Sequence, residues 1–152
     1  MLGIRVLPTI FAVALSVGAW PFVAAAQADE IAQRQAAMKN NGEATKTLAA
    51  FVKGEAAFDG KTVAHAGYTI ANNLVAFGTL LPEGSTGENT RAKPEIWQDM
   101  EGFMAAAEEA SAAAKAVAAA GEANDEAAFK VAMGELGNAC GACHEKFRVP
   151  RN

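Results

Sequence analysis

The residue types that could carry chemistry are concentrated near the C-terminus. Cys140, Cys143 and His144 form the run CGACH, and the only other Cys or His in the 152 residues is His65. Residues three and four apart share one face of a helix, so both thiols and the imidazole would lie together. A C-x-x-C-H run is the attachment motif of c-type haem, in which the histidine ligates the iron. We therefore expect one covalently bound haem c, held by Cys140 and Cys143, with His144 on the iron.

Other uses of this motif fit the chain less well. A structural zinc site needs four ligands, and His65 alone is left to add to the motif. A thioredoxin-like dithiol belongs in a βαβ context, and no strand pattern is visible. A disulfide between helical residues three apart is geometrically poor. Haem attachment is the interpretation that uses all three residues.

The N-terminus has the composition of an export signal. Arg5 precedes a long uncharged stretch, and small residues allow cleavage after Ala26 or Ala28. The stretch approaches the roughly 20 residues of a membrane anchor, but its two prolines and its small-x-small ending favour a cleaved signal peptide. We expect residues 1–28 to be removed. The remainder, 29–152, is then one domain in the bacterial periplasm, with no stable membrane insertion.

The charge balance limits the partners. The formal net charge is −4, and it becomes −5 without the signal segment, which holds Arg5 and no acid. Binding to nucleic acid or to anionic lipid is not expected of such a domain. A redox partner protein with a basic patch would complement it, although the sequence identifies no such partner.

Helix breakers divide the alanine-rich mature chain at three places. Four helices are expected, at 30–53, 60–81, 94–120 and 125–148. Pro94 suits the first position of the third helix, and Asn124 suits the N-cap of the fourth. Apolar residues recur at helical spacing in each segment, and both cysteines lie on the stripe of the last one. The pattern predicts an all-α, antiparallel four-helix bundle with haem c inside it.

The first of these helices has the weakest stripe. Its stripe positions recur at sevens: Ile31, Met38, Thr45 and Val52. Gly42 interrupts the helix at a cost of about 1 kcal/mol relative to Ala. A glycine beside two asparagines on a core-facing helix suggests that the cofactor occupies that space.

Three motifs in this order resemble one family over the whole mature chain. They are Arg34-Gln35-x-x-Met38-Lys39, Pro94-Glu95-Ile96-Trp97 and the closing Cys140-x-x-Cys143-His144-x-x-Phe147-Arg148. The chain is similar to the class II c-type cytochromes, which comprise cytochrome c′ and cytochrome c-556. The resemblance implies that Arg148 and Arg34 lie near the haem propionates, although Arg148 equally suits the negative end of its helix. It also makes a homodimer possible.

The role of Met38 divides two functions. Its position matches the distal residue of the family, which ligates iron in the c-556 branch and only covers an open face in many cytochromes c′. Methionine is also a common core filler. The main hypothesis is a periplasmic one-electron carrier, not an enzyme, with His144 and Met38 as axial ligands. The alternative is a five-coordinate haem that binds NO or CO.

Overall fold

The structure, a computed structural model, describes residues 20–87 and 89–150, with side chains from Asp29 onward. Its helices are α1 (Trp20–Val52), α2 (Gly60–Gly78), the short α3 (Glu95–Gln98), α4 (Met100–Glu122) and α5 (Glu126–Phe147). Within the described ranges the only β-type pairing is an isolated bridge between Ala92 and Arg148. The expected all-α bundle is confirmed.

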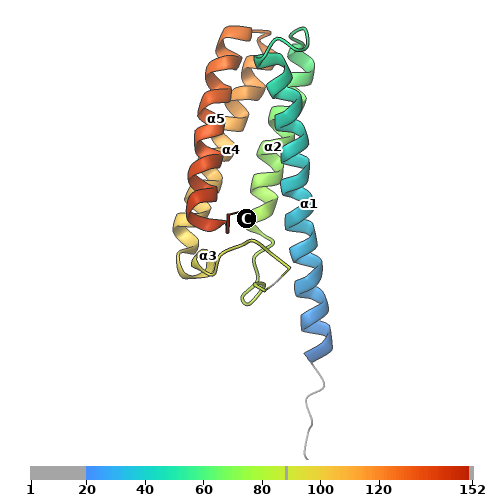
Figure 1. Cartoon of the computed structure of the whole chain (residues 1–152), viewed down its shortest axis with the longest axis vertical. Helices are drawn as coiled ribbons and strands as arrows, with labels where there is room; N and C mark the ends of the chain where they lie inside the picture. Colours follow the sequence, from blue (N-terminus) through green and yellow to red (C-terminus); the bar gives the residue numbers. More distant parts are fainter. Residues whose placement is uncertain (1–19, 88, 151–152) are drawn as a thin grey trace, which may run out of the picture.

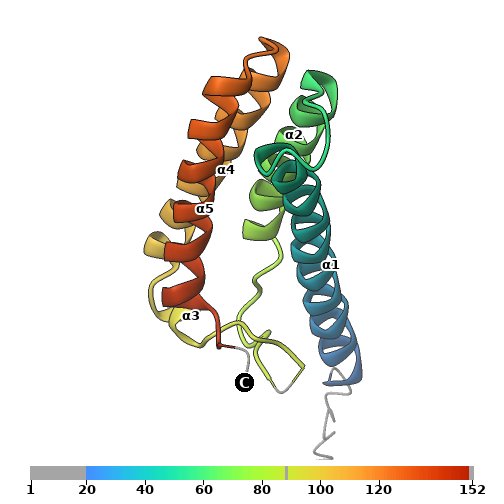
Figure 2. The ribbon, with the colours of Figure 1, turned by 45° about the horizontal axis from the view of Figure 1, so that its top comes forward.

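The four long helices run antiparallel and form two layers. In Figures 1 and 2, α4 and α5 form one layer and α1 and α2 the other. The described residues 79–87 and 89–99, which include α3, lie beneath the ends of α2 and α5, and the first turns of α1 project beyond them. No helix among the described residues is both apolar and long enough to cross a bilayer.

Two hydrophobic clusters form the core. The main cluster lies between the long helices and is centred on Leu48, Ile70, Val117, Phe129 and Leu136. The end cluster lies beside α3 and consists of Leu81, Ile96, Phe103 and Phe147. The stripes expected on α2, α4 and α5 are buried or half-buried along their length, so helical periodicity identified three of the four core faces.

The close approach of α2 to α4 depends on glycine. A Cβ added to Gly67 would lie 2.7 Å from the backbone N of Ala118 and 2.8 Å from the carbonyl O of Ala114. These atoms belong to a helix backbone that cannot yield without separating the layers. Gly67 therefore sets the spacing of the two helices.

The expected third helix is interrupted at Asp99. This residue leaves helical geometry (φ −135°, ψ 60°) and its carboxylate caps α4 by accepting the N–H of Gly102. Pro94 precedes α3 as its N-cap and is not its first residue. Asp125, not Asn124, caps α5, and Asn124 adopts a positive φ of 52°.

The face that α1 buries also differs from the expected one. Thr45 is exposed and Val52 is 41% exposed, whereas Leu48 and Phe51 are buried. Arg34 and Asn41 lie on the buried face too. The Asn41 side chain has a hydrogen-bond partner there, because its Oδ1 accepts from Nδ2 of Asn73 at 2.8 Å.

Candidate haem-attachment site

The last turns of α5 carry the C-x-x-C-H motif. The helix begins at a well-formed cap, because the Asp125 carboxylate accepts the N–H groups of Ala127 and Ala128 at 3.0 and 2.9 Å. Cys140, Cys143 and His144 are all half-buried. Cys140 packs against the main cluster and Cys143 against the end cluster. The motif therefore lies where the two clusters meet.

The environment of these residues favours neutral groups. Burial raises the pKa of both thiols, and Cys140 raises that of Cys143 further, against the opposing effect of Arg148. Burial lowers the pKa of His144, and the positive charges of Arg148 and Arg91 lower it further. A neutral imidazole is the form that ligates metal.

The residues present fit a covalently attached haem. Both cysteines are free and share one face of α5, with apolar side chains on either side and a neutral imidazole next in sequence. Nowhere in the described ranges do three or more His, Cys, Asp or Glu side chains gather to hold a metal ion, so the zinc interpretation gains no support. His65 is exposed on α2.

Met38 lies on α1, across the bundle from α5 (Figure 1). Its side chain is half-buried and packs against the main cluster, the same cluster that Cys140 contacts. Met133 of α5 is the comparable methionine, since it is also half-buried and packs on the same cluster. Whether Met38 ligates iron stays a prediction.

Arg34 holds a loop in place. The residue is 2% exposed. Its guanidinium donates to the carbonyl of Leu80 at 2.5 Å, to Ser85 Oγ at 2.9 Å and to the Ser85 carbonyl at 2.7 Å. It also lies 6.0 Å from the ring centroid of Trp97, whose Nε1 donates to the Pro82 carbonyl. The role of Arg34 beside a propionate stays a prediction.

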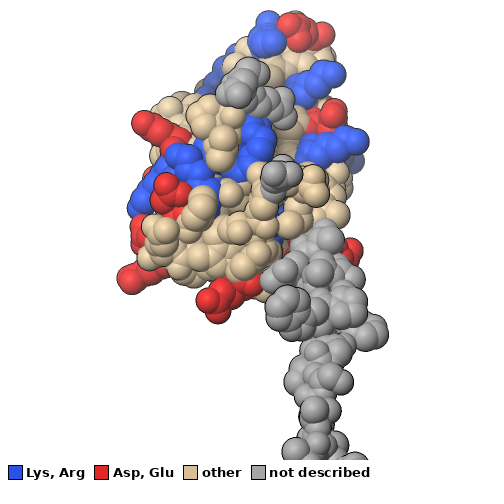
Figure 3. All heavy atoms as spheres, turned by 60° about the horizontal axis from the view of Figure 1, so that its bottom comes forward, with Lys and Arg blue, Asp and Glu red and all other residues tan. Residues whose placement is uncertain are grey.

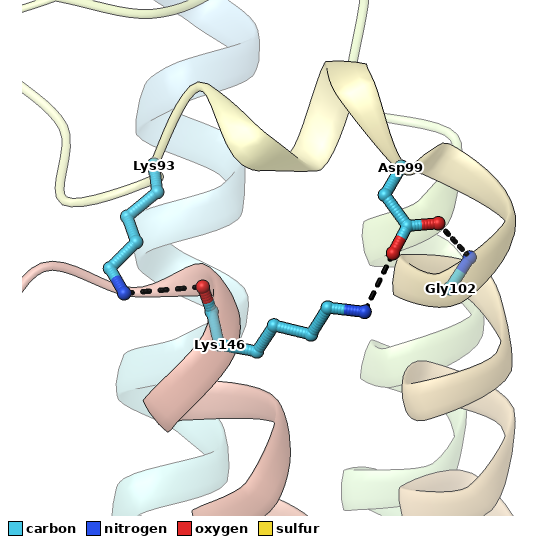
Figure 4. A network of polar contacts seen from close by, with 4 residues as sticks. All are labelled: Lys93, Asp99, Gly102 and Lys146. Carbon is cyan, nitrogen blue, oxygen red and sulfur yellow. Dashed lines mark hydrogen bonds and ion pairs between the residues drawn. The ribbon is translucent and has the colours of Figure 1, made fainter.

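The end of α5 is tied to residues 91–99, which the sequence interpretation missed. The backbone N–H of Lys93 donates to the Phe147 carbonyl at 3.0 Å, and that of Val149 donates to the Arg91 carbonyl at 2.8 Å. Lys146 pairs with Asp99 at 2.6 Å (Figure 4). The sequence shows that Arg91 and Lys93 stand close to Pro94, but only the fold shows which carbonyls they contact.

Arg148 follows directly after α5 and its side chain points toward solvent, since the residue is exposed. Figure 3 views the end of the bundle where α5 terminates: Lys and Arg side chains gather across its middle, and acidic ones lie mostly around its rim. The charge of Arg148 acts on the motif, as its effect on the pKa of His144 and Cys143 shows. Its contact with a propionate stays a prediction.

Comparison with known proteins identifies the family of this chain. The family model described as Cytochrome C' matches residues 29–148. Cytochrome c' of Rhodopseudomonas palustris is 42% identical over 130 residues, covering 85% of this chain and 88% of that protein. Cytochrome c-556 of Agrobacterium tumefaciens strain B2A is 39% identical and covers 82% of this chain and 100% of its own. The crystal structure of cytochrome c' from Rubrivivax gelatinosus superposes with a TM-score of 0.74 at 36% identity, covering 81% of this chain and 97% of that one. The family model matches most of this chain, and each of these relatives aligns with it over most or all of its own length. This protein therefore belongs to the cytochrome c′ family.

Proposed function

We propose that this protein is a haem c protein of the cytochrome c′ type, with the iron position opposite His144 open to a small gas such as NO or CO. The family binds haem c covalently. When bound, that group supplies an iron that changes between ferrous and ferric states and can take a further ligand. The family model and the relative at 42% identity, both cytochrome c′, favour this function over the carrier expected first.

The residues of the chain have separate tasks in this proposal. Cys140 and Cys143 fix the cofactor to α5 through two thioether bonds. His144 offers a neutral imidazole on one side, since burial and two neighbouring arginines lower its pKa. The two clusters provide apolar walls that exclude water on either side of the motif.

The packing of Met38 is the observation that carries the open-site proposal. The side chain already contacts the main cluster, so its apolar surface has a role without coordination. In the holoprotein, a methionine packed in this way would cover the face opposite His144 and keep it apolar. Such a face admits a small neutral molecule and discriminates against ions and water.

A second candidate is the electron carrier with Met38 as the sixth ligand. The 39% identity to a cytochrome c-556 over that protein's full length favours it. A Met/His pair would raise the reduction potential. The two candidates differ in one bond, so a single substitution separates them.

The experiment compares Met38→Ala with Met133→Ala in the purified holoprotein. An open site predicts that the wild type binds CO when reduced. It also predicts that Met38→Ala binds CO more tightly without a change of ferric spin state, and that Met133→Ala resembles the wild type. Ligation by Met38 predicts a low-spin wild type without ready CO binding, and a change of spin state in Met38→Ala alone. That second result would overturn the proposal.

Export to a bacterial periplasm and removal of residues 1–28 belong to the same proposal. Residues 1–19 lie outside the described residues, and both expected cleavage positions fall within α1, which cleavage would shorten. The intact mass of protein from a periplasmic extract should equal a chain that begins at Gln27 or Asp29 plus one haem. A chain that retains Arg5 would contradict it. A homodimer stays a prediction from the family.

A further inference from the structure

The last turn of α5 is completed by a residue far away in the sequence. A helix leaves its last four carbonyls without intrahelical partners, and in α5 these belong to residues 144–147. The His144 carbonyl accepts the backbone N–H of Arg148 at 3.1 Å. The other three accept hydrogen bonds from one residue, Lys93.

Lys93 uses both its ammonium and its backbone. Nζ donates to the carbonyls of Glu145 at 2.9 Å and Lys146 at 3.2 Å, and the backbone N–H donates to the carbonyl of Phe147 at 3.0 Å. Figure 4 shows the side chain reaching the end of α5 from the segment that leads into α3. A cation at this point also faces the negative end of the helix dipole.

A second contact holds the same turn from the other side. Lys146 Nζ lies 2.6 Å from Asp99 Oδ2, and Asp99 Oδ1 accepts the N–H of Gly102 at 3.0 Å (Figure 4). Both side chains of the ion pair are about half exposed. Such a pair contributes little by itself, so Lys93 is the principal support.

We propose that Lys93 is a positioning residue for His144, because its hydrogen bonds fix the last turn of α5, which carries the imidazole. The inference rests on the proposed role of His144 as the iron ligand. Groups that hold a ligating histidine set its orientation and tune the metal.

The test compares three variants of the holoprotein. Lys93→Met keeps the aliphatic stem and removes the ammonium, Lys93→Arg keeps a charged donor, and Lys115→Met removes an exposed lysine from α4. The readouts are the haem midpoint potential and the hyperfine-shifted proton resonances of the axial imidazole. We expect Lys93→Met to move these resonances and to change the potential, with Lys93→Arg close to the wild type and Lys115→Met unchanged. Wild-type values of both readouts in Lys93→Met would overturn the proposal.

Lys93→Gln keeps the test decisive if Lys93→Met does not fold. Glutamine is neutral and one atom shorter, so it does not reproduce the contacts of the ammonium with the carbonyls of Glu145 and Lys146. The imidazole resonances should then move, and wild-type resonances in Lys93→Gln would overturn the inference. Failure of the proposed function is distinguishable, because a wild type with Met38 as sixth ligand would be low-spin and would not respond to CO, while the resonances of the His144 imidazole would remain.

Discussion

Arg34 of α1 and Ser85 of the loop beneath the bundle form a buried pair, in which the guanidinium donates to both the hydroxyl and the carbonyl of Ser85, at 2.9 and 2.7 Å. Ser85 is fully buried and Arg34 is 2% exposed. Burial lowers the pKa of Arg34, against the opposing effect of Glu30. A desolvated cation is stable here because it is matched to three oxygens, including the Leu80 carbonyl.

Replacing Arg34 should destabilise the fold. Arg34→Met keeps much of the stem but leaves the oxygens of Ser85 and Leu80 without their donor. Each unsatisfied buried group costs about 1–3 kcal/mol, so we expect the free energy of unfolding to fall by at least that amount in a denaturant titration. Gln33→Met, an exposed neighbour on α1, is the control. Equal stabilities of the two variants would contradict the account, and an unchanged haem spectrum would remove Arg34 from the cofactor-binding residues.

Two glycines should respond in opposite directions to alanine. Gly67→Ala places a Cβ within 2.7 Å of the α4 backbone, so it should destabilise the protein by about 1–3 kcal/mol. Gly42→Ala adds a Cβ with no heavy atom within 4 Å, in an exposed part of α1. It should stabilise by about 0.5–1 kcal/mol, since alanine is the better helix former. Thermal unfolding of both variants checks the signs, and a stabilising Gly67→Ala would refute the close approach of α2 and α4.

Acid should weaken the contact between α4 and α5. The hydrogen bond from Lys146 and the one from the Gly102 N–H lower the pKa of Asp99. The folded chain therefore binds fewer protons at this carboxyl than the unfolded chain does. Its stabilising effect is full above the unfolded pKa of about 4 and is lost as the pH falls toward the lower folded value. Stability measured from pH 6 to pH 3 should fall more steeply in the wild type than in Asp99→Asn, and parallel curves would contradict this assignment.

The parts of the fold that could be predicted from sequence are those that local spacing determines. The motif on α5 needs two thiols and an imidazole at fixed intervals, so its chemistry and its helical face follow from one short run. The stripes of α2 and α4 follow from the period of the helix, because nearly every core position on them is apolar or small.

The parts that were missed depend on contacts between distant residues. The buried face of α1 carries the polar residues Arg34 and Asn41. A search for apolar residues at helical spacing therefore predicts a neighbouring face, and the last two residues of that face, Thr45 and Val52, are exposed. Only the fold supplies the partners, Ser85 and Asn73, that make those polar groups tolerable. The same is true of Lys93, whose carbonyl partners lie 52 and 53 residues further along the chain. No Gly or Pro stands at the break between α3 and α4 itself. The one signal there is Asp99, because Asp is a favoured N-cap and accepts the N–H of the residue three positions later.

The absorption spectrum of the purified wild-type protein tests the central claim most directly. The ferric form is recorded first, and CO is then added to the ferrous form. An open position opposite His144 predicts a ferric spectrum without a sulfur-to-iron band at its red edge, and a ferrous spectrum that shifts when CO is added. A sulfur-to-iron band that disappears in Met38→Ala, with no response of the wild type to CO, would contradict the open site and make Met38 the sixth ligand.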